Sequence, residues 1–472
     1  MTSTAFRVAA LLAALFSSVA LPAAHAQEPL PAPEGPWHGT IEVGGQRLTA
    51  IFRLKRGKDG ALTATMDVPQ QNASGIPVSD ARATADSLRL VVGAIGGVFE
   101  GARTRSGSID GTWKQNGVTV PLVLERGAPE SSDTTAPARP QTPEPPFPYE
   151  TEDVRFESNA GSVELAGTLK RPEGEDLPPA VVLISGSGPQ NRNGRVAGHK
   201  TLHVLADALT RRGVAVLRYD ERGVGESSGT FAGATTEDLA ADVRAGLDLL
   251  RQRNDLGKVG LIGWSEGGIV APMIAARSST VDFLVLMGAP GVPGKALLLE
   301  QSARIAEAQG AAPATLDSIR TAQDRLLSAV AQAPDSAEAA TQIRRVLGER
   351  QKSQETIEAQ IQQYTAPWFR YFVDHDPRPA LRKVDAPVLA LYGANDLQVP
   401  PRQNAAPLRE ALSGNADATV EVLPGLNHLF QPAETGLPSA YRRIETTIAP
   451  KALQRIAGWI TERTRKGSGD AP

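Results

Sequence analysis

Cysteine is absent from this chain of 472 residues, which excludes disulfide bonds, thiolate zinc sites and a cysteine nucleophile. A surplus of basic residues is also missing, because 49 Lys and Arg stand against 52 Asp and Glu, giving a formal net charge of −3. Nucleic-acid-binding proteins usually carry a basic surplus, so we expect no nucleic-acid partner. The chain has only six histidines, which leaves few candidates for imidazole chemistry.

Residues 1–26 have the pattern of a secretory signal peptide. Arg7 supplies a positive charge, residues 8–21 are almost all apolar or small, and the segment ends in Ala24-His25-Ala26. The apolar run is shorter than the ~20 residues that a membrane-spanning helix needs. We therefore expect cleavage after Ala26 and an exported, periplasmic or extracellular protein without stable membrane insertion.

Residues 27–127 are predicted to form an all-β domain, because apolar and polar residues alternate over short runs and nothing helical interrupts them. Turn-forming sequences lie between the runs, at residues 44–45, 58–60 and 116–117. We expect a small barrel or sandwich of roughly seven to nine strands. Trp37 and Trp113 are expected to fill its core. This domain holds no plausible set of nucleophile, base and acid.

Residues 128–148 are a Pro-rich linker, interpreted as a semi-stiff spacer. From 149 to 466, β-like and helical runs alternate, which predicts an α/β domain with a mainly parallel sheet covered by helices on both faces. Thr236 is the expected N-cap of one of these helices. Residues 293–378 read as amphipathic helices, predicting a helical cap over the carboxyl edge of the sheet. Residues 467–472 are expected to be a disordered tail.

A candidate nucleophile lies in Gly263-Trp264-Ser265-Glu266-Gly267, which follows an apolar run at 259–262 and precedes a helix-compatible run at 269–276. This is the G-x-S-x-G pattern in a strand–turn–helix context. The glycines permit a sharp turn that projects the Ser265 hydroxyl from the end of the strand. A serine hydroxyl needs an adjacent base to act as a nucleophile.

The base is expected to be His428, because it follows the last predicted strand in a loop that can reach the Ser265 turn. His375 is the second candidate. The remaining histidines beyond the leader are His38 in the β domain and His199 and His203, which are spaced i, i+4 on a probable helix. That spacing can bind a metal, but no nearby carboxylate completes the set, so a solvated or capping role is expected for both.

The carboxylate that orients the base is expected to be Asp396, directly after the predicted strand at 388–392 and on the same side of the sheet as Ser265. Asp385 and Asp282 precede their strands and would lie at the opposite edge. The resulting chain order of Ser265, Asp396 and His428 is the order found in α/β-hydrolases.

An oxyanion needs two donors, and we expect the backbone N–H groups of Glu266 and Ser187. Ser187 lies in the Gly-rich loop after the strand predicted at 180–184, with Gly188 as the alternative donor. No lysine follows this loop in the phosphate-binding pattern. The charged turn at 220–227 is interpreted as structural.

Together these residues resemble the serine α/β-hydrolase superfamily and, more narrowly, EstD-type bacterial carboxylesterases. The motifs are S-G-S-G-P-Q-N-R-N at 185–193, D-E-R-G-V-G-E-S at 220–227, G-W-S-E-G-G at 263–268, P-W-F at 367–369 and G-A-N-D-L-Q-V-P at 393–400. The resemblance covers residues 149–464. It implies an α/β-hydrolase fold with a cap, and hydrolysis of short to medium acyl esters by Ser265, Asp396 and His428 without a metal or cofactor. Trp264 departs from the pattern, since histidine is frequent there.

Two alternatives remain open. One is a serine peptidase or thioesterase on the same triad; an aminopeptidase would need cap carboxylates, for which Glu300, Glu307 and Asp317 are available. The other is a surface- or polymer-binding protein whose hydrolase domain is vestigial. The sequence makes no prediction of the oligomeric state.

Overall fold

The computed structural model describes residues 33–43, 46–57, 60–68, 73–104, 106–115, 118–127, 138–174, 177–348 and 354–464. Several predicted segments lie outside these residues: the signal peptide, the turns at 44–45 and 116–117, most of the turn at 58–60, the first part of the linker and the tail at 467–472. No helix within the described ranges has the length and apolar character needed to cross a bilayer.

The N-terminal domain is a single antiparallel meander in the order β4-β3-β2-β1-β9-β8-β7-β6-β5. Its strands are β1 (Gly35–Val43), β2 (Gln46–Arg56), β3 (Leu62–Val68), β4 (Ala73–Pro77), β5 (Asp80–Ala83), β6 (Ser87–Val92), β7 (Gly97–Arg103), β8 (Ile109–Gln115) and β9 (Val118–Arg126). The chain between β4 and β5 joins the two ends of the sheet. Val78 N–H donates to Ala64 O in β3, and Ser79 N–H donates to Val91 O in β6. The sheet thus curls into a barrel.

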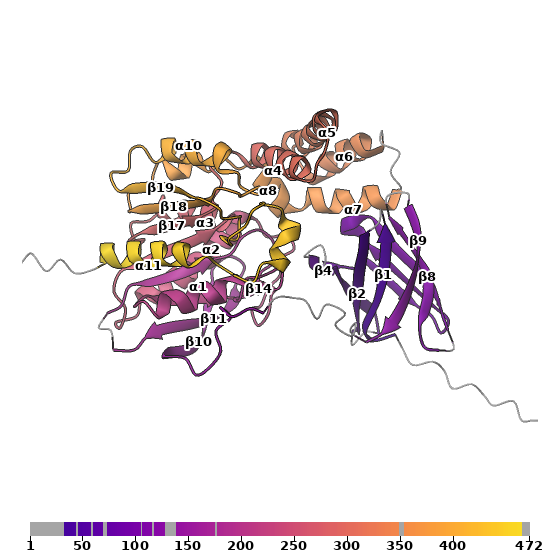
Figure 1. Ribbon diagram of the computed structural model, residues 1–472, viewed down its shortest axis with the longest axis horizontal. Coiled ribbons are helices and arrows are strands. Elements are labelled where there is room, and N and C mark those ends of the chain that lie inside the picture. Colours follow the sequence, from indigo (N-terminus) through magenta and orange to yellow (C-terminus); the bar gives the residue numbers. More distant parts are fainter. Residues whose placement is uncertain are drawn as a thin grey trace, which may run out of the picture. The chain divides into compact units, whose positions relative to one another are not determined.

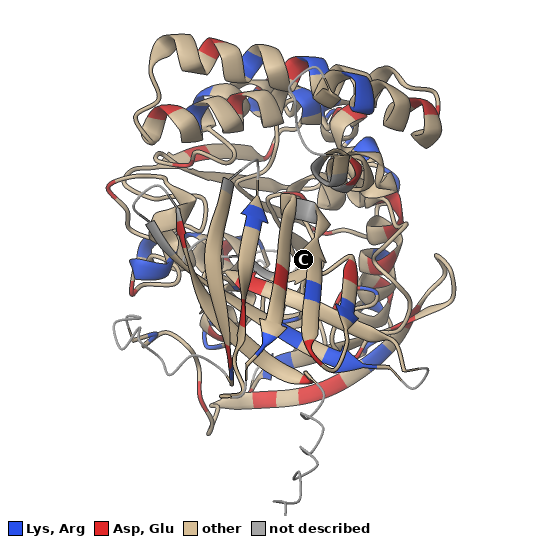
Figure 2. Ribbon diagram, turned by 90° about the vertical axis from the view of Figure 1, so that its right-hand side faces the viewer, with Lys and Arg blue, Asp and Glu red and all other residues tan. Residues whose placement is uncertain are grey.

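The interior of this sheet is filled by large apolar side chains. Trp37 and Trp113 are each 1% exposed, and the Phe52 ring lies 6.2 Å from that of Trp113. The prediction that both tryptophans fill the core is confirmed. Outward-facing charges pair across strands, as in Arg53–Asp67. Basic and acidic residues are interspersed in the view of Figure 2, which shows no continuous band of one sign.

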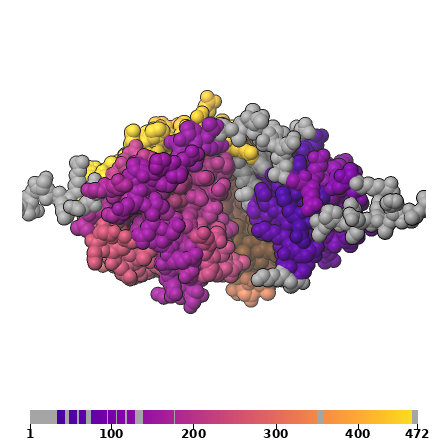
Figure 3. All heavy atoms as spheres, turned by 90° about the horizontal axis from the view of Figure 1, so that it is seen from below, coloured from indigo at the N-terminus to yellow at the C-terminus, as the bar shows by residue number. Residues whose placement is uncertain are grey.

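The second domain contains an eight-stranded sheet in the order β10-β11-β15-β12-β16-β17-β18-β19. The strands are β10 (Tyr149–Ser158), β11 (Val163–Pro172), β12 (Ala180–Ile184), β15 (Ala215–Tyr219), β16 (Val259–Trp264), β17 (Leu284–Met287), β18 (Val388–Gly393) and β19 (Ala418–Leu423). β10, β11 and β15 pair antiparallel, and the other pairs are parallel. The edge strand β10 belongs to the purple segment at the surface in Figure 3. The predicted mainly parallel sheet is therefore present.

Both faces of this sheet are covered, because alternate residues of each strand point to opposite sides. Val181 and Leu183 of β12 pack with α1 (Thr201–Thr210) and α11 (Pro450–Thr464). Ala180, Val182 and Ile184 pack on the other side, where the helices are α2 (Thr236–Arg251), α3 (Gly267–Ala275) and α10 (Pro401–Ala411). Figure 1 shows these helices around the sheet.

The N-cap of α2 is Thr235, not Thr236 as the sequence predicts. Asp238 N–H donates to Thr235 Oγ1, and Asp238 Oδ2 accepts from Thr235 N–H at 2.8 Å, which completes a capping box. Thr236 is buried at the first position of the helix, and its hydroxyl bonds Glu266 instead. Adjacent threonines make the two positions hard to distinguish by sequence.

The segment between β17 and β18 is helical, as predicted, over its described residues. It contains α4 (Gly294–Ala308), α5 (Pro313–Gln332), α6 (Ser336–Gly348), α7 (Gln354–Thr365), α8 (Pro367–Asp374) and α9 (Arg378–Leu381). Leu327, Val330, Ile343 and Phe369 belong to a hydrophobic cluster of its own. We call residues 294–381 the insert.

The described part of the linker is bonded to the second domain, which the prediction of a semi-stiff spacer did not include. The Arg139 guanidinium donates to the carbonyl oxygens of Arg442 and Ile444, and Gln141 bonds the backbone of Thr447 and Ile448. Residues 442 and 443 end the short 3-10 helix η3 (Pro438–Arg443). Composition predicts an extended chain here. It cannot show that Arg139 and Gln141 form hydrogen bonds with backbone groups that lie about 300 residues later in the sequence.

Candidate active site

Ser265 occupies a strained turn at the carboxyl end of β16. Its φ of 55° lies in the left-handed region that side chains rarely adopt. The flanking glycines are required by close packing, because a Cβ on Gly263 would overlap the carbonyl oxygen of Gly267, and one on Gly267 would lie 2.6 Å from Ile184 O. The turn is anchored by the hydrogen bond from Ser265 N–H to Met287 O at 2.8 Å. The strand–turn–helix context predicted for the nucleophile is present.

His428 and Asp396 form a buried pair. His428 Nδ1 lies 2.7 Å from Asp396 Oδ2, and the residues are 5% and 2% exposed. The second carboxylate oxygen, Oδ1, accepts from the N–H groups of Gln398 and Val399, each at 2.8 Å. These two bonds fix the carboxylate so that its free oxygen meets the imidazole. Asp396 follows β18 and His428 follows β19, as the sequence predicts.

Ser265 and His428 line one cavity of about 380 Å³. The two side chains are not hydrogen bonded to each other within the described structure. Hydrogen bonds of this kind are often long before a ligand is bound and shorten in the complex. The structure therefore brings together the three residues that the sequence selects: Asp396 contacts the imidazole, and Ser265 lines the same cavity as His428.

The predicted oxyanion loop lies directly against the serine. A Cβ on Gly186 would lie 3.2 Å from Ser265 Cβ. Across the described residues, neither Ser187 N–H nor Glu266 N–H donates to a protein acceptor. Both donors therefore remain available to a bound oxyanion, and their assignment remains a prediction.

Two buried carboxyl groups lie beneath this loop, and sequence reasoning gave neither side chain a role at the site. Glu221 accepts from the Ser185 hydroxyl and, at 2.8 Å, from Gln190 N–H, so it joins the two ends of the loop. Burial raises the pKa of Glu221 to about 8. Nearby, Arg222 pairs with Asp242 at 2.7 Å, which agrees with a structural turn at 220–227.

Glu266 is 2% exposed, and burial raises the pKa of its carboxyl. Its Oε1 accepts from the Thr236 hydroxyl at 2.8 Å and from the Trp368 indole N–H at 2.7 Å. The side chain of Glu266 therefore connects the nucleophile turn to α2 and to α8 of the insert.

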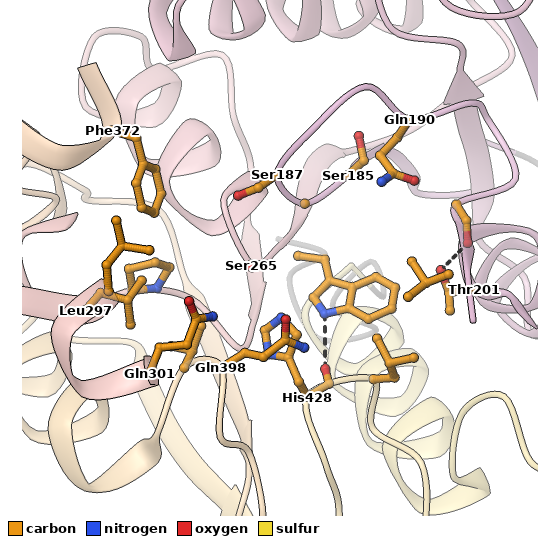
Figure 4. Close-up of a pocket in the computed structure, with 18 of the residues that line it drawn as sticks. Ser185, Ser187, Gln190, Thr201, Ser265, Leu297, Gln301, Phe372, Gln398 and His428 are labelled. Atoms are coloured by element: carbon orange, nitrogen blue, oxygen red, sulfur yellow. Dashed lines mark hydrogen bonds between the residues drawn. The ribbon is translucent and has the colours of Figure 1, made fainter. Parts of the chain in front are cut away.

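The cavity has two sides, one from the insert and one from the sheet domain. Figure 4 shows a group of residues on either side of Ser265: Leu297, Gln301 and Phe372 from the insert, and Ser185, Gln190 and Thr201 from the sheet domain. None of the described lining residues is Lys, Arg, Asp or Glu. Trp264 also lines the cavity, and its indole N–H donates to His428 O at 3.2 Å. The sequence singled out Trp368 and Phe369 only as part of a motif, and the other insert residues that line the cavity carried no signal.

The prediction that His199 and His203 share a helix was wrong for His199 and right for His203. His199 lies in the two-residue strand β14 (His199–Lys200), not on a helix, and is 1% exposed. His203 lies on α1 and is half-buried, and burial lowers the pKa of each histidine to about 4. His199 is therefore not solvated. His375 stacks on Tyr371 and does not line the cavity. Among the described residues, no cluster of three or more His, Asp or Glu is arranged to hold a metal ion.

Comparisons with known proteins identify relatives of the second domain. The family model described as serine aminopeptidase, S33 matches residues 193–434. Esterase EstD of Thermotoga maritima is 24% identical over 299 residues, which are 63% of this chain. The match spans 66% of that protein, less than two thirds of its length.

Similar solved structures include an esterase and the protein Est1E. The Pyrococcus furiosus esterase Pf2001 has a TM-score of 0.42 and 15% sequence identity, covering 67% of this chain and 90% of its own. Est1E from Butyrivibrio proteoclasticus has a TM-score of 0.39 and 14% identity, covering 66% of this chain and 99% of its own.

Proposed function

Because the chain belongs to the serine aminopeptidase S33 family of α/β-hydrolases, we propose that it is an exported serine carboxylesterase acting on short to medium acyl esters. The observation that carries this proposal is the cavity that Ser265 shares with His428, the partner of Asp396. The described lining of this cavity contains no Lys, Arg, Asp or Glu. The insert acts in this proposal as the cap of the site.

The proposed reaction proceeds through an acyl-enzyme. His428 takes the proton of the Ser265 hydroxyl as the oxygen attacks the ester carbonyl, and Asp396 stabilises the imidazolium. The N–H groups of Ser187 and Glu266 donate to the oxyanion. His428 then protonates the leaving alcohol, and a water molecule repeats the sequence to release the acid. Every step uses groups of this chain and neither a metal nor an organic cofactor.

The size and lining of the cavity support a small, uncharged ester. A volume of about 380 Å³ lies near the lower end of the range for small-molecule sites. Leu297, Phe372 and Trp368 supply an apolar wall, which favours an aliphatic or aromatic group. A charged substrate would have to lose its water shell without gaining a partner of opposite charge.

An aminopeptidase is less well supported, although the family is described by that activity. Binding the substrate's ammonium group needs a carboxylate at the cavity. Glu300 and Glu307 both pair with Arg304, Asp317 is exposed, and none of them lines the cavity. The side chain of Glu266, beneath the turn, bonds Thr236 and Trp368. Thioester hydrolysis uses the same groups and is decided by the experiment below.

The test is a substrate panel with the chain that begins after Ala26. p-Nitrophenyl esters from acetate to laurate are compared with aminoacyl p-nitroanilides and with acyl thioesters of the same chain lengths. Turnover of esters, with the highest kcat/KM at short or medium length and none by Ser265→Ala, supports the proposal. Faster turnover of anilides or thioesters would replace it by the corresponding alternative, and a folded protein inert on all three would remove it.

Export is proposed from the leader at residues 1–26. Expression of the full chain in a bacterium followed by fractionation tests it. We expect a product in the periplasm or medium whose N-terminus is Gln27. A cytoplasmic product that retains the leader would contradict export and leave the esterase proposal unaffected.

A further inference from the structure

The residues at 138–148, here called the strap, are bonded to the segment at 442–448. Arg139 Nη1 donates to Ile444 O at 2.9 Å, and Nη2 donates to Arg442 O at 2.5 Å. Gln141 Oε1 accepts from the N–H groups of Thr447 and Ile448, at 2.6 and 3.0 Å, and its Nε2 donates to Ile448 O at 2.8 Å. Five hydrogen bonds from two side chains therefore hold this segment.

The Gln141 side of the strap leads to the turn that carries His428. Thr447, whose N–H bonds Gln141, contacts His199 Nδ1 through its hydroxyl at 2.8 Å. His199 Nε2 lies 2.8 Å from Gln431 Nε2, and Gln431 Oε1 accepts from Asn427 Nδ2 at 2.9 Å. These four side chains are at most 1% exposed. The path ends beside His428.

Asn427 and Gln431 define the shape of that turn. Asn427 Oδ1 accepts from the N–H groups of Leu429 and Gln431, each at 3.0 Å. Asn427 N–H in turn donates to Gln431 O at 3.1 Å. His428 lies inside this closed ring of bonds. A shift of Gln431 therefore moves the backbone from which the imidazole projects.

The Arg139 side leads to Asp396. Arg139 holds the last residues of η3, and Tyr441 of η3 is 2% exposed. The Tyr441 hydroxyl accepts from Gln398 Nε2 at 3.1 Å, and Gln398 N–H donates to Asp396 Oδ1 at 2.8 Å. The same short helix therefore connects the strap to the carboxylate that faces His428.

We propose that Arg139 and Gln141 are positioning residues for the Asp396–His428 pair, so that part of the apparent linker belongs to the catalytic domain. The expected loss of turnover rests on the proposed function. The expected change in the structure of the turn at 427–431 does not. Polar groups buried in this way keep one arrangement only while each has its partner. Removing the strap side chains takes these bonds from three carbonyl and two N–H groups of residues 442–448 and frees the network to rearrange.

The experiment compares Arg139→Ala, Gln141→Ala and the double variant with the unchanged protein in the full chain. Glu144→Ala is the matched control, because Glu144 is an exposed residue of the same strap. The active sites are counted by stoichiometric labelling with a fluorophosphonate, and kcat and KM are measured per labelled site well below the unfolding temperature. Hydrogen exchange of residues 427–431 is followed in parallel.

We expect kcat per labelled site to fall by about tenfold to a hundredfold, with KM changed less than about twofold, because small displacements of a catalytic group have effects of this size. Exchange at 427–431 should accelerate in the strap variants and stay unchanged in Glu144→Ala. Gln141→Glu, which keeps the oxygen that accepts from the N–H groups of Thr447 and Ile448, should recover part of kcat. Fewer labelled sites with an unchanged kcat per site would show a merely structural role and overturn the proposal.

The two proposals can fail separately. A protein that neither hydrolyses esters nor takes the label, yet shows faster exchange at 427–431 in the strap variants, refutes the esterase but retains the coupling. An active esterase whose strap variants keep both kcat and exchange refutes the coupling alone.

Discussion

The indole N–H of Trp368 donates a 2.7 Å hydrogen bond to Glu266 Oε1. Glu266, which follows Ser265 in the chain, is therefore bonded to α8, a helix that lines the cavity. Trp368 stacks on Phe372, with 5.6 Å between the ring centroids, and both rings line the cavity. The position of the apolar wall is therefore tied to the turn that carries Ser265.

Replacing Trp368 by Phe should weaken the binding of longer acyl chains. The variant keeps an aromatic ring but removes the indole donor from Glu266 Oε1, and losing a partner of a buried polar group costs about 1–3 kcal/mol. We expect KM to rise several-fold for octanoate and to change little for acetate. Tyr371→Phe is the control, since it also loses one hydrogen bond from α8 but does not line the cavity. Equal effects in the two variants would contradict this role of Trp368.

Replacing Asp396 by Asn should remove most activity without unfolding the protein. The amide keeps the shape but presents the wrong hydrogen-bonding group to His428 Nδ1, and in related triads this change lowers kcat by about 10⁴-fold. Asp385→Asn, at the opposite end of the same strand, should keep normal kcat because that residue is exposed. A comparable loss in both variants would mean that the effect is one of folding, and normal kcat in Asp396→Asn would refute the triad.

The raised pKa of Glu221 predicts how stability depends on pH. Burial is the main cause, and the carboxyl groups of Glu266 and Asp242 add to it, against hydrogen bonds from Ser185 and Gln190. Between pH 4.5 and about 8 the folded state retains a proton that the unfolded state releases, so this group lowers the free energy of unfolding as the pH rises.

Glu221→Gln should abolish that contribution. The free energy of unfolding is measured by urea unfolding of the unchanged protein and of the variant at pH 5 and pH 9. Relative to the unchanged protein, the variant should be more stable at pH 9 than it is at pH 5. Glu157→Gln, an exposed residue on β10, should show no such shift. A constant difference between the unchanged protein and Glu221→Gln would show that Glu221 titrates as an ordinary carboxyl group.

The sequence predicted those site residues that lie in loops directly after strands. In a parallel sheet the loops after successive strands meet at one edge, so Ser265, Asp396 and His428 could be chosen by their positions after predicted strands. The resemblance to EstD-type esterases was also readable from short motifs, and the match to esterase EstD confirms it. Local pattern was sufficient for both.

The parts that failed depend on partners far away in the sequence. The spacing of His199 and His203 suggests a helix, but β13 (Arg195–Val196) pairs with β14 in a hairpin. His199 of this hairpin is buried against Thr447 and Gln431. Nothing near Arg139 or Gln141 indicates that they bond the backbone at 442–448. Which faces of amphipathic insert helices reach the cavity is likewise decided by packing.

Lys170, on β11, gives a prediction about a buried ammonium group. It is 1% exposed, its ammonium group lies 4.9 and 4.7 Å from the ring centroids of Phe147 and Tyr149, and burial lowers its pKa to about 7. Between pH 7 and 10.5 the unfolded state holds a proton that the folded state has lost, so this group raises stability as the pH rises.

Lys170→Met, which conserves much of the volume, should therefore be more stable than the unchanged protein at pH 6, where the folded state must bury the charged ammonium group. Its advantage should shrink by pH 9.5. Urea unfolding at both values measures this, with Lys383→Met as the control because Lys383 is exposed. The ammonium group is stabilised by the 2.6 Å bond that Lys170 Nζ donates to the Tyr149 hydroxyl and by its contacts with the two rings. A variant that is less stable than the unchanged protein at pH 6 would mean that these contacts stabilise the folded state by more than the burial of the charge destabilises it, which would contradict the prediction.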